Sequence, residues 1–165
     1  MVKGAEIARC LLRLSVGGTL IAHGLKHGRT PEGTAKWFDS IGFRNPELQA
    51  TLSSVVEVGA GSALVAGAAT PIAASAVIGT MAVATQTVHR PNGFFITSEG
   101  YEYVLALSIS SAALAALGAG RVSVDRLLGL DRRLSGPGAA ALAVGLGLLG
   151  AAAQLRTFWT RPPAK

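Results

Sequence analysis

The chain has 165 residues, a net charge of +6 at pH 7 and a mean hydropathy of +0.44. Half of the residues are hydrophobic and only 15% are charged, against about 25% in an average soluble domain. The basic residues are spread over predicted loops and helix ends, which argues against nucleic-acid binding and favours contact with membrane lipids. The single cysteine, Cys10, excludes an internal disulfide.

Three stretches of the sequence contain no Asp, Glu, Lys or Arg, and they cover residues 58–89, 103–120 and 134–155. A membrane-spanning helix needs about 20 mainly apolar residues, so each stretch can supply most or all of one. An Ala-rich soluble bundle is the alternative, but residues 72–88 and 139–155 lack the polar face that a surface helix presents. The sequence therefore predicts an integral membrane protein.

The first spanning helix is expected over residues 5–24, and it carries Arg9 and Arg13 inside an apolar segment. At about 100° per residue, both arginines fall on the same helix face as Gly17. A charge that faces lipid near the bilayer centre costs about 2.5–3.5 kcal/mol. Arg13 is therefore expected to face other helices and to act as a structural polar residue, in packing or interhelix pairing.

A polar segment follows, and within it residues 34–41 are expected to form a short helix at the membrane interface. Trp37 and Phe38 would lie at headgroup level, where aromatic side chains are enriched. The second spanning helix is expected over residues 48–68. It contains Glu57, a second charge inside an apolar segment, and such intramembrane carboxylates usually pair with other groups or serve function.

After a short turn at Pro71, the third and fourth spanning helices are expected over residues 71–88 and 101–117. Residues 122–134 are predicted to form an amphipathic helix along the membrane surface, because leucines and arginines are interspersed there. A fifth spanning helix is expected over residues 137–155. The predicted fold class is an all-α membrane protein, a four-helix transmembrane bundle plus a fifth C-terminal transmembrane helix.

Helix phasing brings several charged and histidine side chains to the same membrane face. If the first two helices are antiparallel neighbours, Glu57 lies nearer in depth to His23 than to Arg13. The predicted cluster comprises His23, Lys26, Glu57, His89 and Glu102. Three interpretations stay open: an ion-pair lock between helices, the headgroup end of a quinone or lipid site, or a metal site. No diagnostic ligand spacing supports the metal.

Ordered short motifs resemble the DoxX family of small bacterial membrane proteins, over roughly residues 5–130. The motifs are Arg13-Leu14-x-x-Gly17, His23-Gly24-x-Lys26, Trp37-Phe38-x-x-Ile41-Gly42, Glu57-Val58-Gly59, His89-x-x-Asn92-Gly93-Phe94-Phe95, Gly100-Tyr101-Glu102-Tyr103 and Gly120-x-x-Ser123-x-Asp125. The family-type polar residues are thus Arg13, His23, Lys26, Glu57, Asn92 and Glu102. Asn92 joins the predicted ligand-binding set on this resemblance alone.

The resemblance implies a four-helix bundle with its N-terminus in the cytoplasm, although the count of flanking Lys and Arg does not favour that orientation. Family members are associated with thiosulfate:quinone oxidoreductase and terminal quinol oxidase and with redox stress. The extra stretch 139–155 departs from the family pattern and would move the C-terminus across the membrane. We therefore predict a DoxX-like bundle over residues 1–130 and an additional helix with a basic tail over residues 131–165.

The function expected from these features is that of an accessory component of a quinone-linked redox or respiratory assembly in the bacterial plasma membrane. A quinone or lipid headgroup would bind near His23, Glu57 and Glu102, and membrane lipids are expected partners. The alternative is a non-catalytic structural or assembly subunit that binds a partner protein or forms a homo-oligomer. The sequence leaves enzymatic activity and cofactors open, and it predicts neither a metal site nor a nucleic-acid partner.

Overall fold

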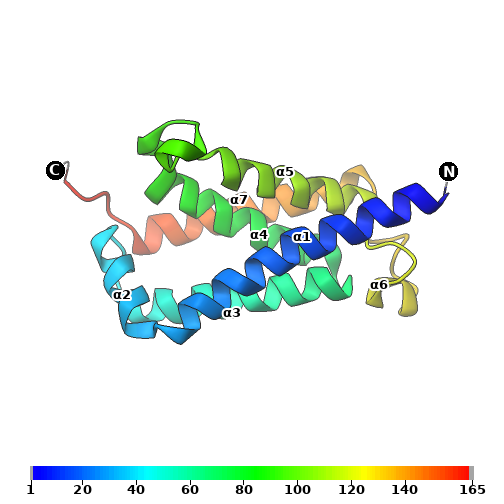
Figure 1. The fold of residues 1–165 in the computed structure, drawn as a ribbon, viewed down its shortest axis with the longest axis horizontal. Coiled ribbons are helices and arrows are strands. Elements are labelled where there is room, and N and C mark those ends of the chain that lie inside the picture. The colour runs from blue at the N-terminus through cyan, green and yellow to red at the C-terminus, as the bar shows by residue number, and fades with distance from the viewer. Residues whose placement is uncertain (1, 164–165) are drawn as a thin grey trace.

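The computed structural model describes residues 2–163, and within them the chain is all-helical, with three candidate membrane-spanning helices. Residue 1 of the first predicted domain and residues 164–165 of the second lie outside the described part. The long helices run alongside one another between two ends of an elongated bundle (Figure 1). The α-helices are α1 (Val2–Arg29), α2 (Pro31–Ser40), α3 (Pro46–Ala66), α4 (Thr70–Ala84), α5 (Glu102–Leu117), α6 (Val124–Leu127) and α7 (Pro137–Phe158).

Proline and glycine mark several of the helix boundaries. Pro31, Pro46 and Pro137 occupy the first positions of α2, α3 and α7, where the missing N–H would have no helical partner. Gly67 ends α3 in the left-handed conformation with φ +65°, which lets its N–H bond back to the helix. Because these signals are local, the sequence predicts most boundaries to within a few residues.

The chain runs back and forth between the two ends, which we name after the short helices there. The α6 end holds the start of α1, the turn between α3 and α4, and α6; the α2 end holds α2, the loop between α4 and α5, and the end of α7 (Figure 1). Helix α1 packs chiefly on α3, and α4 packs against both α5 and α7. The two termini therefore lie at opposite ends.

Three helical segments are long and apolar enough to cross a membrane, namely Pro46–Ala66, Thr70–Asn92 and Pro137–Phe158. The second consists of α4 and two continuing turns, the π-helical η1 (Thr85–His89) and the 3-10 turn η2 (Arg90–Asn92). A further 3-10 turn, η3, covers Ile96–Ser98. Helix α5 is apolar but has only 16 residues. The predicted number of four plus one spanning helices therefore stays a prediction.

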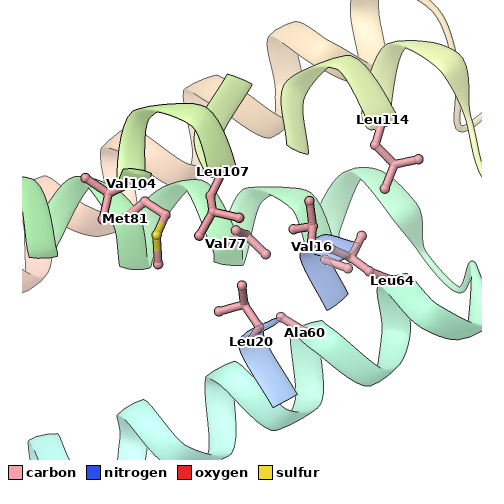
Figure 2. Close-up of a cluster of buried hydrophobic side chains, with 10 residues drawn as sticks. Val16, Leu20, Ala60, Leu64, Val77, Met81, Val104, Leu107 and Leu114 are labelled. Atoms are coloured by element: carbon pink, nitrogen blue, oxygen red, sulfur yellow. The ribbon is translucent and has the colours of Figure 1, made fainter. Parts of the chain in front are cut away.

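The main core cluster lies between α1, α3, α4 and α5. Figure 2 shows Leu20 of α1 and Met81 of α4 extending into the same space between their helices. Helices α1 and α3 also approach closely, since a Cβ built on Gly17 would lie 2.6 Å from the carbonyl oxygen of Gly61. Small residues permit such approach in lipid, where helices associate by packing rather than by the hydrophobic effect.

The predicted amphipathic helix over residues 122–134 is wrong. Only one turn, α6, forms there, and Gly129 at φ +69° ends it while its N–H bonds back to Arg126. The turn is drawn inward because the backbone N–H of Asp125 donates to Gly67 O at 2.9 Å, which fixes the segment against the α3–α4 turn. A tertiary contact thus overrides the amphipathic pattern, and Leu127 stays 86% exposed.

Candidate functional site: an apolar cavity with partnerless polar groups

A cavity of about 590 Å³ lies at the α2 end of the bundle. Its wall is mainly apolar, and side chains of the core cluster such as Leu20, Met81 and Leu107 form part of it. Phe38 of α2 and Phe158 of α7 line it as well. Ligand pockets commonly measure about 300–1,000 Å³ and combine apolar walls with a few polar groups, so both the size and the lining fit a small lipophilic ligand.

Glu57 of α3 is the buried carboxyl group of this cavity, with 5% of the residue exposed. Its Oε2 lies 3.4 Å from Nδ1 of His27, in the last turn of α1. That separation suits an ion pair but not a hydrogen bond, and Oε2 has no hydrogen-bond partner in the described residues. His27 Nδ1 instead lies 3.1 Å from the hydroxyl of Ser53, one turn before Glu57.

Gln49, two turns before Glu57 on α3, is a second buried polar residue in the cavity wall, and it is 1% exposed. Its Oε1 accepts a hydrogen bond of 2.8 Å from Nε2 of Gln154 on α7. Its own Nε2 is buried without a partner among the described residues. An unsatisfied buried donor or acceptor costs about 1–3 kcal/mol, so a ligand that satisfies these two groups would be bound with advantage.

The π-helical turn η1 supplies one wall of the cavity through Thr87, Val88 and His89. Such turns inside α-helices occur frequently at functional sites, because they re-aim the side chains that follow. His89 Nδ1 lies 2.7 Å from the carbonyl oxygen of Glu99, which ties η1 to the loop before α5. The turn therefore joins the end of α4 to that loop beside the cavity.

Of the six residues predicted to bind a ligand, the structure brings three to the cavity: His23, Glu57 and His89. Lys26 is exposed and lies outside the cavity lining. Asn92 and Glu102 also lie outside it and stabilise the loop, since Asn92 Nδ2 donates to Val88 O at 3.2 Å and Glu102 accepts from the N–H of Ile96 at 3.0 Å.

Sequence reasoning missed several cavity residues, although part of the signal was available. Gln49, Ser53 and Glu57 are spaced four residues apart and so share one face of α3, as His23 and His27 do on α1. No comparable spacing identifies Gln154, which reaches the site from α7. Among the missed lining residues are His27, Trp37, Phe38, Gln49, Ser53 and Gln154.

Arg13 lies away from this cavity, at the α6 end, and it is 6% exposed. Its guanidinium donates four hydrogen bonds of 2.5–3.0 Å to the carbonyl oxygens of Leu64, Val65, Ala119 and Val122. The first two carbonyls belong to the last turn of α3, where helix carbonyls lack internal partners. The contacts of Arg13 are thus with the backbone of α3 and of the α5–α6 segment.

Within the described residues, no group of three or more His, Cys, Asp or Glu side chains is placed to hold a metal ion. The histidines near the cavity are His23, His27 and His89, and only Glu57 adds a carboxylate to its lining. The imidazole, carboxyl and amide groups of this site can donate or accept hydrogen bonds.

The fold and the spans define an all-helical membrane protein with a polar-edged cavity at one end. A sequence model of the DoxX family matches residues 8–90, half of the chain. The chain belongs to the DoxX family. The match includes Gln49, Ser53 and Glu57 of α3 but ends before α5 and α7. Neither the comparison with curated proteins nor that with solved structures finds a match.

Proposed function

We propose that this protein is an integral accessory component of a quinone-linked redox or respiratory assembly in the bacterial plasma membrane, and that its cavity receives the headgroup of a quinone or a comparable lipid. One observation carries the proposal. The cavity is apolar over most of its wall, yet Glu57 Oε2 and Gln49 Nε2 are buried there without hydrogen-bond partners among residues 2–163. A ring with oxygen substituents and an apolar tail complements both features.

The residues present suit such a headgroup. Gln49 offers an N–H donor, and Glu57 with His27 offers a pair that can hold or pass a proton at the ligand oxygen. A bound quinone would supply the electron-accepting chemistry, while these side chains orient it and exclude water. Among the described residues, Glu57 makes no ion pair with Lys or Arg, and its polar contact with α1 is the one with His27 at 3.4 Å.

The membrane arrangement that we propose adds α1 and α5 to the three clear spans, giving four helices plus α7. This places the α6 end, with the N-terminus, on the cytoplasmic side and the cavity near the opposite membrane face. Residues Arg121, Arg126, Arg132 and Arg133 are all exposed at or near α6. The α2 end carries more Lys and Arg than the α6 end, so the proposed orientation follows the family pattern and not the charge count.

The competing function is that of a structural or assembly subunit without ligand chemistry. The outward faces of the long helices favour it as a second candidate, because large apolar side chains are exposed there, among them Leu11 at 62%, Val55 at 64% and Leu149 at 69%. Such faces can contact either lipid or a partner protein. Measuring ligand binding separates the two functions.

Trp37 offers a direct measurement, because it lines the cavity and stacks on His27 with ring centroids 6.4 Å apart. Decylubiquinone should quench the tryptophan fluorescence of the purified protein in nanodiscs, and the quenching should saturate. The other tryptophan, Trp159, lies outside the cavity lining, so Trp37→Phe should remove most of the saturable signal. Quenching that rises linearly with quinone, equally in both proteins, would reflect partition into lipid and would count against the site.

A further inference from the structure

The cavity depends on a helix that lies outside the family match. Helix α7 supplies Gln154 and Phe158 to the lining, although the DoxX match ends at residue 90. Gln154 is also the residue that hydrogen-bonds Gln49. The α3 residues of the site therefore belong to the region that matches the family, whereas their polar contact Gln154 lies outside that region.

The Gln154–Gln49 contact occupies one end of the Gln49 amide. Gln154 Nε2 donates to Gln49 Oε1 at 2.8 Å, so the oxygen of that amide is occupied. The NH2 group is left as the unpaired end, and it is buried. Without Gln154, rotation of the Gln49 side chain would exchange its donor and acceptor ends at no comparable cost, because an amide carries both.

The end of α7 is itself held against the loop between α2 and α3. The Trp159 indole N–H donates to Ile41 O at 2.8 Å, and the N–H of Arg44 donates to Phe158 O at 2.7 Å. The N–H of Thr160 donates to Gly42 O at 2.9 Å. These bonds begin within one turn of Gln154, so they limit its movement along and around the helix axis.

We propose that Gln154 is a positioning residue that orients the Gln49 NH2 group toward a hydrogen-bond acceptor oxygen of the ligand, and that α7 thereby sets the specificity of the cavity. This inference rests on the proposed function. The inference adds to the proposed function the chemical group that is recognised beside α3, namely a carbonyl or other acceptor oxygen on a lipophilic molecule. Ligands of the same size without that oxygen leave the Gln49 donor unpaired and bind less well.

The test compares two ligands in nanodiscs, decylubiquinone by Trp37 fluorescence quenching and decylbenzene by competition against it. Gln154→Leu should weaken decylubiquinone binding about five- to tenfold, the range expected for one lost neutral hydrogen bond. Its affinity for decylbenzene should stay within about twofold, because that ligand offers no acceptor oxygen. Gln154→Glu should weaken decylubiquinone as well, since a carboxylate accepts from the Gln49 NH2 and occupies it.

Gln86→Leu is the matched control, because Gln86 lies outside the cavity lining and its Oε1 accepts from Arg90 at 3.0 Å. It should leave both affinities unchanged. If Gln154→Leu yields no folded protein, Gln49→Leu is the second variant, and it should show the same selective loss for decylubiquinone.

Three outcomes would overturn the proposal in distinguishable ways. Wild-type protein that binds neither compound contradicts the proposed function and this inference together. Saturable wild-type binding that Gln154→Leu leaves unchanged contradicts the role of Gln154 alone. Equal weakening of both ligands in Gln154→Leu would mean that the residue only shapes the cavity or joins α7 to α3, as interhelix amides do in membranes.

Discussion

The buried polar groups at the two ends of the bundle differ in how fully they are hydrogen-bonded. At the α6 end, the Arg13 guanidinium satisfies four backbone carbonyls, and the Asp125 carboxylate accepts from the N–H groups of Ala69 and Thr70 at 2.7 and 3.0 Å. At the α2 end, Glu57 and Gln49 are as deeply buried, yet each has a buried polar atom without a hydrogen-bond partner in the described part of the chain. Burial alone therefore does not separate structural groups from candidate binding groups.

The difference has an energetic meaning. The charges at the α6 end supply what helix termini lack, since Arg13 caps the last carbonyls of α3 and Asp125 caps the first N–H groups of α4. The unpaired groups at the α2 end lower stability, by about 1–3 kcal/mol for each. Natural proteins retain such unfavourable groups chiefly at sites of function.

The largest loss of stability is expected from Arg13→Leu, which removes the hydrogen bonds that Arg13 makes at the α6 end. The change leaves the carbonyl oxygens of Val65, Ala119 and Val122 without this donor, and each buried unsatisfied acceptor costs about 1–3 kcal/mol. We expect a corresponding fall in the free energy of unfolding, measured by SDS titration of the protein in mixed micelles with circular dichroism.

Arg126→Leu is the control for that prediction. Arg126 also belongs to the α6 end, but its ion pair with Asp131 is exposed, with side-chain exposures of 48% and 23%. Exposed pairs contribute about 0–1 kcal/mol. Equal effects of the two substitutions would contradict the view that backbone capping by Arg13 stabilises this end.

A smaller loss of stability is expected from Gly61→Ala, at the close contact between α1 and α3. A Cβ at this position would lie 2.6 Å from the carbonyl oxygen of Gly17, so α1 and α3 must separate. Overpacking of this kind costs about 1–3 kcal/mol. Gly59→Ala, two residues earlier on α3, is the control, because nothing lies within 4 Å of its Cβ. A stability loss in Gly59→Ala as large as in Gly61→Ala would exclude the close approach as the cause.

The helices were predictable because their signals are local. Apolar length, with Pro71 and Pro137 at or near helix starts, defines most of the fold within a few residues. The segment 122–134 was not predictable, because a bond from Asp125 to the α3–α4 turn replaces the expected helix. Periodicity within a segment carries no information about such distant contacts.

The candidate site was predictable only where its residues lie on one face of a helix or close to a helix end. Depth along the helices placed His23, Glu57 and His89 at one end, and all three line the cavity. Depth alone could not distinguish them from Lys26, which is exposed at the same end. Gln154 was beyond sequence reasoning, because its place in the cavity wall follows from the packing of α7 against α4 and α5 and from its hydrogen bond to Gln49 of α3.

The smallest effect on stability is expected from Glu57→Gln, and this substitution sharpens the comparison most. Because Oε2 has no hydrogen-bond partner among the described residues and lies 3.4 Å from His27 Nδ1, a neutral amide of the same shape should change the free energy of unfolding by less than about 1 kcal/mol. Quenching of Trp37 by decylubiquinone should weaken about tenfold, since a group that can take or give a proton at the ligand oxygen is lost. A stability loss as large as that of Arg13→Leu, with unchanged quenching, would instead make Glu57 and His27 a lock between α1 and α3.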